Sequence, residues 1–336
     1  MRVTINDVAK KAKVSRATVS AVINNRQVVR LETREKVLQA IKELNYVPSE
    51  LARGLSRMEH KVIGLVVRDI VNPFHSDITE VVSEIAQRNG YNLVFFNSGL
   101  NFDQEAKTIQ MLIKMRASGA IILPQVSNDD TSHLQMLITH NIPFVLINEP
   151  IEGLDAEYVY CNVENALYEA IEHLVQLGHK NIAFQRGPST AQSTDLREKV
   201  YKQALNDYGY FLNADYLFYG GADVETSYNS TLKLLRSFPE ISAIVAHNDL
   251  AAIGVLRAAE ELGVLIPDNL ALIGVDNIAF SQDLRVPLTT VNIPTRELGK
   301  VAIERLLMQI NDSNFVRRST MLDGRLVVRE SSGGRL

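Results

Sequence analysis

Apolar residues recur along the chain with two different periods, and the change between them falls near residue 60. Over residues 4–44 the apolar positions lie three or four residues apart, a spacing that predicts short amphipathic helices. From Val62 onward, apolar and β-branched runs such as VIGLVV, YNLVFF, GAIILP and PFVLIN alternate with helical stretches. This alternation predicts a parallel sheet covered by helices. The chain is therefore expected to join an all-α head to an α/β body.

Three short helices are predicted in the head, over residues 4–13, 16–23 and 32–44. Thr4 followed three residues later by Asp7 is typical of a helix start, and Ser15 can cap the second helix. Two short helices joined by a tight turn form a helix-turn-helix. The residues expected to close its core are Ile5, Val8, Ala9, Ala12, Val19, Val22, Ile23, Val37, Leu38, Ile41 and Leu44.

A second series of apolar runs follows the first one in the body. NIAF, AIVAHND and LALIGVD are the predicted strands, with helices over about residues 196–208 and 250–262 between them. The first series likewise has predicted helices around residues 78–87, 104–116 and 131–140. The body is therefore expected to consist of two similar doubly wound parallel-sheet lobes.

Charge is distributed unevenly along the 336 residues. Residues 1–60 hold 12 Lys/Arg and 6 Asp/Glu, a net charge of +6, whereas the remainder holds 23 basic and 33 acidic residues, a net charge of −10. A basic head on an acidic body is the pattern expected when only the head meets nucleic-acid phosphates.

Several classes of protein are disfavoured by what the sequence lacks. Cys161 is the single cysteine, so an extracellular disulfide framework is excluded. The first residues, MRVTINDVAKKAKVS, lack the apolar core of a signal peptide, and no segment is long and apolar enough to span a membrane, so a cytoplasmic location is expected. Phosphate-binding glycine loops, nucleophile elbows and zinc-protease motifs are also missing. Neither an enzyme, a metal site nor a cofactor is expected.

The head and the body both resemble one family of regulators. TINDVAKKAKVSRATVSAVINN and TREKVLQAIKELNYVPSELARGLSR resemble the head and hinge of the lactose/galactose-repressor family. VIGLVVRDIVNPF, HLVQLGHKNIAF, AIVAHNDLAAIGVLRAAEELGVLIPDNLALIGVD, PLTTVNIPTRELG and RLVVRES resemble its periplasmic-binding-protein-like core. The VRD stretch and EISAIVAHND look like the maltose-regulon repressor branch. The resemblance covers nearly the whole chain.

The resemblance implies a domain organisation and a function. The helix-turn-helix head would comprise residues 1–47, a hinge helix residues 48–60 and an effector-binding and dimerisation core residues 61–336. Three chain crossings would divide the core into lobes of about residues 61–161 plus 291–322 and 162–290 plus 323–332. Such a protein is a sequence-specific transcriptional repressor that binds a pseudo-palindromic double-stranded DNA operator as a homodimer. A small ligand between the lobes would control its affinity for the operator.

The resemblance also implies which residues contact DNA. The second helix would lie in the major groove, where Arg16 can donate two hydrogen bonds to guanine and the Ala17 methyl can contact a thymine methyl. Leu55, beside Ala52 on the apolar face of the hinge helix, would wedge into the minor groove. Residues expected to contact phosphates or flank the reading surface are Thr4, Thr18, Ser20, Ala21 and Asn24.

Two departures from the family pattern concern the head. Lys13 stands in the turn where the family commonly has glycine, and a side chain with positive φ costs about 1 kcal/mol there. Arg30 and Leu31 stand where a capping serine and a first-turn proline are common, so the third helix lacks its usual start signal.

Polar residues that follow predicted strands are the candidate ligand contacts, because the resemblance places the ligand at the carboxyl ends of the strands. Arg197 and Asp276 match family contact positions best. The full set is Asp69, Phe74, Asn148, Arg197, Asn248 and Asp276. Carboxylate, amide and guanidinium groups suit a polyhydroxylated ligand, and a carbohydrate is expected. Ala222 stands where relatives often have an aromatic residue that stacks on the ligand.

Two alternative functions remain open at this stage. A purine-type regulator shares every motif and differs in whether its ligand strengthens DNA binding as a corepressor. A sugar-binding protein without a DNA role shares the body, but it would need a secretory signal and would not need a basic head.

A dimer rather than a tetramer is expected because the last residues lack leucine heptads.

Overall fold

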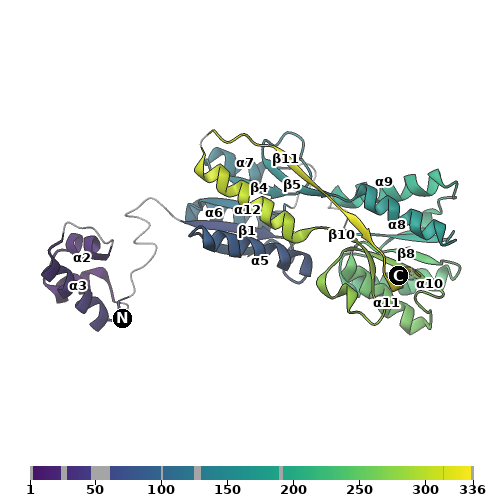
Figure 1. Cartoon of the computed structure of the whole chain (residues 1–336), viewed down its shortest axis with the longest axis horizontal. Coiled ribbons are helices and arrows are strands. Elements are labelled where there is room, and N and C mark those ends of the chain that lie inside the picture. The colour runs from purple at the N-terminus through teal and green to yellow at the C-terminus, as the bar shows by residue number, and fades with distance from the viewer. Residues whose placement is uncertain are drawn as a thin grey trace. The chain divides into compact units, whose positions relative to one another are not determined.

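The chain forms two compact units, Met1–His60 and Lys61–Leu336 (Figure 1). The computed structural model describes residues 3–23, 29–46, 61–99, 101–124, 130–188, 192–312 and 314–333. The hinge expected at residues 48–60 lies outside these ranges, as do Asn24, Ala52 and Leu55.

Unit 1 contains the three predicted helices, α1 (Ile5–Ala12), α2 (Arg16–Ile23) and α3 (Leu31–Glu43). At the start of α1 both the backbone N–H and the hydroxyl of Thr4 donate to an Asp7 carboxylate oxygen, at 2.8 and 2.6 Å. The turn after α1 contains Lys13 at φ 54°, the left-handed conformation expected at this position. Ser15 Oγ then accepts a hydrogen bond from Thr18 N at 3.0 Å and caps α2, as predicted.

The core of unit 1 differs from the prediction at one residue. Val8, Val19 and Val37 are fully buried and hold the three helices together. Leu38 was expected beside them, but half of its surface is exposed, because it follows Val37 directly and so lies about 100° around the helix from the face of α3 that Val37 buries. Val37 and Ala40 carry the buried face of α3 instead, and Ile41 and Leu44 pack against it from partly exposed positions.

The first lobe of unit 2 is built on a parallel sheet. Its strands lie in the order β11-β5-β4-β3-β1-β2, and every neighbouring pair is parallel. The strands are β1 (Val62–Val67), β2 (Asn92–Asn97), β3 (Gly119–Ile122), β4 (Phe144–Ile147), β5 (Glu157–Asn162) and β11 (Ser319–Asp323). The first four coincide with the predicted apolar runs.

Helices cover both faces of this sheet. α5 (Pro73–Arg88) and α12 (Thr295–Asn311) pack together on one face, and α6 (Phe102–Met115) and α7 (Ser132–Thr139) cover the other. Alternate residues of a strand therefore enter different cores: Leu65 packs with α5 and α12, whereas Val66 packs with α6 and α7. A strand buried on both faces is continuously apolar, which explains why VIGLVV shows no polar alternation.

The second lobe repeats this architecture. Its strands lie in the order β12-β10-β9-β8-β6-β7, and all pairs are parallel except β10 with β12. The strands are β6 (Ile182–Arg186), β7 (Leu217–Tyr219), β8 (Ala243–Val245), β9 (Ala271–Asp276), β10 (Thr289–Asn292) and β12 (Arg325–Val327). α8 (Glu164–Gln176) and α9 (Gln192–Asp207) cover one face, and α10 (Val224–Ser237) and α11 (Asp249–Leu262) cover the other. Short 3₁₀ turns occupy Ala214–Tyr216, Ala279–Gln282 and Glu330–Ser332.

The chain passes between the two lobes at three places that lie side by side. These are the segments after Asn162, after Asn292 and at Gly324, between β11 and β12. Gly324 N donates to Asn162 O at 2.9 Å, and a Cβ at Gly324 would lie 3.2 Å from the carbonyl oxygens of both Asn162 and Asn292. The lobes are therefore joined by three adjacent backbone segments, and each lobe is built from separate stretches of sequence.

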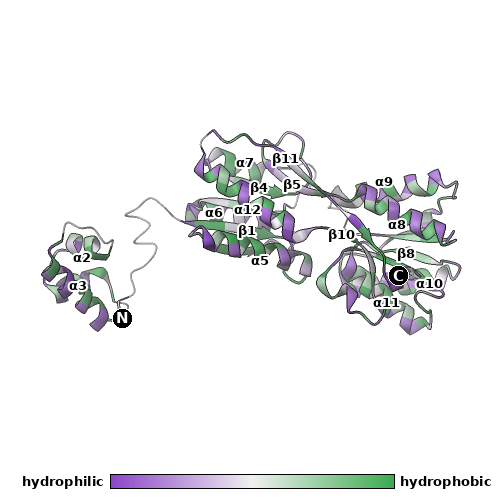
Figure 2. Cartoon of the chain, in the orientation of Figure 1, coloured by the Kyte–Doolittle hydropathy of each residue, from purple (hydrophilic) through white to green (hydrophobic). Residues whose placement is uncertain are grey.

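Hydropathy follows the layers of each lobe (Figure 2). The central strands are mostly apolar, and the helices place their polar residues on the outside. Among the helices that the structure describes, none combines the length and the apolar character that crossing a membrane requires.

The packing of α10 against α11 generates a stability prediction at Gly254. A Cβ at this position would lie 2.5 Å from Val224 O and 2.6 Å from Ser227 Cβ. Alanine gains about 1 kcal/mol of helix propensity, but overpacking costs about 1–3 kcal/mol, and a backbone carbonyl cannot rotate away. We expect Gly254→Ala to lower the free energy of unfolding, measured by urea titration.

The matched control is Gly299→Ala in α12, where the nearest atom would be Ile78 O at 3.1 Å. This variant should lose less stability, because a shift of a few tenths of an ångström relieves the contact. A Gly254→Ala protein as stable as the parent would show that α10 and α11 do not approach so closely.

Candidate DNA-binding surface and ligand pocket

The exposed side of α2 carries the residues predicted to read DNA. Arg16 and Ala17 are exposed, and Thr18, Ser20 and Ala21 are partly buried. Arg16 forms no ion pair with any residue in the described part of the chain, so its guanidinium is available to an outside partner. α2 thus presents a forked donor beside a small methyl group, the combination that base readout in a major groove requires.

Two threonines predicted to contact phosphates already have intramolecular partners. The Thr4 hydroxyl donates its single hydrogen to Asp7, and this hydrogen bond lowers the pKa of the Asp7 carboxyl. The Thr18 hydroxyl lies 2.9 Å from Ser15 Oγ. The Thr4 hydroxyl would have to exchange this partner before it could donate to a phosphate, whereas the Thr18 hydroxyl keeps its hydrogen for an outside acceptor when Ser15 is the donor.

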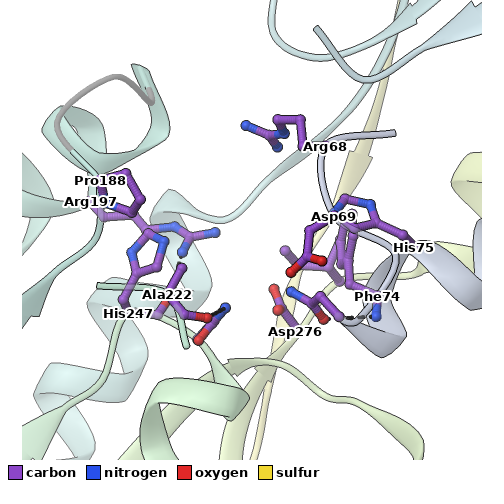
Figure 3. A pocket seen from close by; sticks show the side chains of 12 residues that line it. Arg68, Asp69, Phe74, His75, Pro188, Arg197, Ala222, His247 and Asp276 are labelled. Atoms are coloured by element: carbon purple, nitrogen blue, oxygen red, sulfur yellow. Dashed lines mark hydrogen bonds between the residues drawn. The ribbon is translucent and has the colours of Figure 1, made fainter. Parts of the chain in front are cut away.

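A cleft between the two lobes of unit 2 forms the candidate ligand pocket (Figure 3). Its empty volume is about 730 Å³ with the open solvent at its mouth included, and the centre of a water-sized sphere can reach about 130 Å³ of it. The lining residues follow the carboxyl ends of strands in both sheets. They are Arg68, Asp69, Asn72, Phe74, His75, Pro188, Arg197, Ala222, His247, Asn248, Asp276 and Ile293.

Five of the six predicted ligand residues line this cleft, namely Asp69, Phe74, Arg197, Asn248 and Asp276. Asn148 is not among the lining residues. It follows β4, and its amide group donates to Glu149 O at 2.8 Å, the behaviour of a residue that shapes a turn.

Sequence reasoning missed several lining residues, above all Arg68, Asn72 and His247. Arg68 and Asn72 follow the first predicted strand within a few residues, and His247 lies near the end of another, so the rule that selected Asp69 and Asn248 applies to them equally. The signal was present, but only some of the neighbouring side chains at each strand end were chosen, although several face the cleft.

Several polar lining residues hold the loops in place. Asn72 Oδ1 accepts from Phe74 N at 3.0 Å and caps α5, and Asn248 Oδ1 accepts from Ala251 N at 2.8 Å and caps α11. Asn248 Nδ2 also donates to Ala222 O at 3.1 Å. The side chain of Asp69 accepts from Val71 N at 2.8 Å. These groups position the pocket walls and keep part of their hydrogen-bonding capacity for a ligand.

Two histidines in the pocket are held uncharged. Burial lowers the pKa of His75 to about 3, and the positive charge of Arg68 acts in the same direction. Burial also lowers the pKa of His247 to about 3, together with the charges of Arg197 and Arg68. At neutral pH both imidazoles can donate and accept hydrogen bonds without adding charge.

Asp276 occupies a strained position at the end of β9. Its φ of 115° lies in a region that favours glycine, at a cost of order 1–3 kcal/mol. The neighbouring Asn277 fixes this turn, because its amide donates to Asn292 Oδ1 at 2.8 Å and its oxygen accepts from Arg329 at 2.8 Å. Burial raises the pKa of the Asp276 carboxyl to about 6, although Arg197, Asn72 and Arg68 lower it.

A second buried carboxyl, Asp249, lies behind Asp276. It accepts hydrogen bonds from Thr290 Oγ1 at 2.6 Å and from Ile278 N at 2.9 Å. Burial, followed by the charge of Asp276, raises the pKa of Asp249 to about 8. Gly274 makes room for this carboxyl, since a Cβ there would lie 2.2 Å from Asp249 Oδ1.

Over the part of the chain that the structure describes, no group of three or more His, Cys, Asp or Glu side chains is arranged to hold a metal ion.

Comparisons with known proteins agree with this division into head and body. Residues 4–49 match the bacterial regulatory proteins of the lacI family, and residues 171–332 match the periplasmic binding protein-like domain. The HTH-type transcriptional repressor PurR of Photobacterium profundum is 32% identical over 329 residues, which cover 98% of each chain.

Two solved structures extend the similarity to the fold of nearly the whole chain. The lac repressor dimer bound to operator and the anti-inducer ONPF is 27% identical, with a TM-score of 0.80 over 99% of each chain. The complex of the transcriptional regulator CelR with cellobiose is 28% identical, with a TM-score of 0.73, and the match covers 98% of this chain and 100% of that one.

A helix-turn-helix joined to a two-lobed, binding-protein-like body defines a class of ligand-controlled DNA-binding regulators. This chain belongs to the lacI family of bacterial regulatory proteins. The α/β fold and the family expected from the sequence are thereby confirmed, and the family consists of regulators rather than enzymes.

The raised pKa of Asp249 generates a prediction about pH. The unfolded chain releases the Asp249 proton near the usual pKa of 3.8, whereas the folded chain keeps it until about pH 8. The free energy of unfolding should therefore fall as pH rises from about 4 to about 8, by at most about 1.4 kcal/mol per pH unit for this group. We expect Asp249→Asn to flatten this decline in urea titrations.

The exposed Asp283 provides the control, because Asp283→Asn should leave the slope unchanged. Asp276 acts in the same direction with its pKa of about 6, so a smaller slope should remain in the Asp249→Asn protein. Equal slopes for the parent and for Asp249→Asn would show that Asp249 ionises normally.

Proposed function

We propose that this protein is a sequence-specific transcriptional repressor whose affinity for its operator is controlled by a small ligand bound between the two lobes. The observation that carries the proposal is the presence of both parts in one chain. Unit 1 presents Arg16, which has no ion pair with a described residue, on a helix-turn-helix, and unit 2 presents a cleft lined by buried and partly buried charged residues. The similarity to a lac repressor bound to operator over 99% of each chain supports it.

In this proposal residues 1–47 form the DNA-binding head, residues 48–60 the hinge and residues 61–336 the effector-binding and dimerisation core. One head reads one half-site, so a homodimer on a pseudo-palindromic operator is required for a full site. Arg16 and Ala17 read bases, while Thr4, Thr18, Ser20, Ala21 and Asn24 contact phosphates or flank the reading surface. Ala52 and Leu55 contact the minor groove.

The proposed ligand is a polyhydroxylated molecule of the carbohydrate class. Hydroxyl groups both donate and accept hydrogen bonds, and the cleft offers guanidinium donors, carboxylate acceptors, amides and neutral imidazoles. The similarity to CelR in complex with cellobiose supports this class. Phe74 is the pocket aromatic that can pack against a sugar ring, because Ala222 offers only a methyl group.

Ligand control follows from the two-sided lining of the cleft. Arg68, Asp69 and Asn72 belong to the first lobe, whereas Arg197 and Asp276 belong to the second. A ligand that contacts both sets favours one relative position of the lobes. It can change operator affinity only through its different affinities for the two positions, an effect of about 1–3 kcal/mol.

The direction of control has two candidate answers. A ligand that weakens operator binding is an inducer, and one that strengthens it is a corepressor. The similarity to the repressor PurR at 32% identity favours testing the corepressor direction alongside the inducer direction.

We propose further that the protein acts in the cytoplasm, where bacterial DNA lies, and has no catalytic role. In keeping with this, burial raises the pKa of the Cys161 thiol to about 12, so no thiolate nucleophile forms there at neutral pH.

The proposal is tested by separating the two units. A duplex selected from a randomised DNA library by the full chain should bind it with an affinity that changes when a sugar panel is added. Residues 61–336 alone should lose this DNA affinity and keep ligand binding, because the positive charge lies in residues 1–60. Fluorescence anisotropy measures the DNA affinity, and calorimetry measures ligand binding. Operator binding by residues 61–336 alone would contradict the proposal.

Arg16 generates a second prediction, about specificity. Arg16→Ala should relax the preference at one base pair of each half-site, at a cost of about 1–3 kcal/mol, because a bidentate contact to guanine is lost. Lys42→Ala, on the exposed side of α3, removes the same charge. This variant should weaken binding to all operator sequences alike or leave binding unchanged. A uniform loss across single-base operator variants for Arg16→Ala would instead make Arg16 a phosphate contact.

A further inference from the structure

Two arginines from opposite lobes face the ligand cleft. Arg68 directly follows β1 of the first lobe, and Arg197 lies in α9 of the second. In Figure 3 the guanidinium group of Arg197 extends into the space between the two walls, that of Arg68 lies at the upper end of this space, and the carboxylates of Asp69 and Asp276 face it from another side.

Neither guanidinium is paired with a carboxylate at ion-pair distance in the described part of the chain. Arg197 is only 9% exposed, and its one hydrogen bond to a described residue runs from Nη1 to His247 O at 2.7 Å. Its Nε is buried without a hydrogen-bond partner among the described residues. Arg68 has no hydrogen bond to a described residue, and burial together with the charge of Arg197 lowers the pKa of its guanidinium.

Two other arginines of unit 2 that are withdrawn from solvent have a carboxylate or several hydrogen-bond acceptors as partners for their guanidinium groups. Arg305 binds the buried carboxylate of Glu157. Arg329 donates to Asn277 Oδ1 at 2.8 Å, to Leu288 O at 2.7 Å and to Ser281 Oγ at 3.2 Å. The lack of partners is thus a property of the cleft. Removing a charge from water without a partner costs several kcal/mol, so the buried Arg197, together with the partly exposed Arg68, favours an anion in the cleft.

The carboxyl groups in and beside the cleft do not meet this demand. Asp69 accepts a hydrogen bond from Val71 N. Burial holds the pKa of Asp276 at about 6 in spite of Arg197, and burial also raises the pKa of Glu149, beyond the lining, although Arg197 lowers it. Close ion pairing would lower both values. These carboxyls remain available as acceptors for ligand hydroxyls.

We propose that the effector carries an anionic group, a phosphate or a carboxylate, which binds between Arg68 and Arg197 while its hydroxyls face Asp69 and Asp276. This inference rests on the proposed function and narrows the ligand from a polyhydroxylated molecule to an acidic one. Guanidinium forks from two sides can hold two edges of a phosphate or both oxygens of a carboxylate. The neutral His75 and His247 can add hydrogen bonds without competing for the charge.

The test compares neutral sugars with their acidic derivatives on the full chain by titration calorimetry. The probes are inorganic phosphate, glucose with glucose phosphate and gluconate, and ribose with ribose phosphate and ribonate. We expect at least one acidic compound to bind about ten-fold or more tightly than its neutral parent. Preference for the ester over the sugar acid identifies a phosphate as the anionic group, and the reverse order identifies a carboxylate.

Variants connect this preference to the arginines. Arg68→Gln should abolish it, and Arg68→Lys should keep part of it because the charge remains without the fork. Arg285→Gln is the matched control: it loses the same charge from an 89% exposed side chain paired with Glu260 outside the cleft, and it should bind like the parent. Circular dichroism of each variant shows that the fold is kept.

The inference is overturned if neutral sugars bind as tightly as their acidic derivatives, or if the preference survives in Arg68→Gln. The absence of Arg68-dependent binding by every anion at millimolar concentration, inorganic phosphate included, overturns it as well. Operator affinity measured with the same compounds separates this result from the proposed function. A neutral sugar that alters operator affinity leaves ligand control standing without the anion site. An anion whose binding depends on Arg68 but which leaves operator affinity unchanged supports the anion site without ligand control of DNA binding.

Discussion

The three adjacent crossings beside Gly324 are the constraint on which the rest of unit 2 depends. They hold the carboxyl ends of the two parallel sheets face to face. A Cβ at Gly324 would lie only 3.2 Å from the carbonyl oxygens of both Asn162 and Asn292, so the three segments are closely packed. Loops that follow strands in both lobes therefore open into one cleft. Three parallel connections also restrict the lobes to opening and closing about this line, which is the motion that a ligand contacting both sides can influence.

The cleft stores unfavourable free energy that a ligand can relieve. Asp276 has a φ that favours glycine, two guanidinium groups lack carboxylate partners among the described residues, and Asp249 is a buried acid that stays protonated near neutral pH. None of these features stabilises the ligand-free body, and those that face the cleft, Asp276 and the two guanidinium groups, become useful when hydroxyls and a counter-charge enter. Well-packed cores on both faces of each sheet offset their cost.

The sequence predicted the most strongly apolar strands and the helices between them, and it missed short or exposed strands as well as β5, β10, α8, α10 and α12. VIGLVV and LALIGVD are recognisable because burial on both faces keeps them apolar, whereas β7 and β12 contain three residues each and β11 is half exposed. Leu38 was placed in the core because the sequence alone does not separate it from its buried neighbour Val37 on the helix surface. At the site, strand ends led to Asp69 and Asp276 and the family resemblance to Arg197, but Arg68 was overlooked although it follows the same strand as Asp69. The crossings came only from the resemblance to a known family.

The interleaving of the lobes has a consequence for synthesis on the ribosome. α1, α2 and α3 are contiguous and precede everything else, so the head can fold as soon as it emerges. The first lobe must wait for α12 and for β11, which ends at Asp323, although its other strands lie within residues 62–162. A nascent chain therefore exposes an unfinished sheet edge at β5 from the synthesis of β5 until β11 emerges. A chain released before residue 319 would keep the sequence that recognises DNA but lack the edge strand that completes the ligand-binding body.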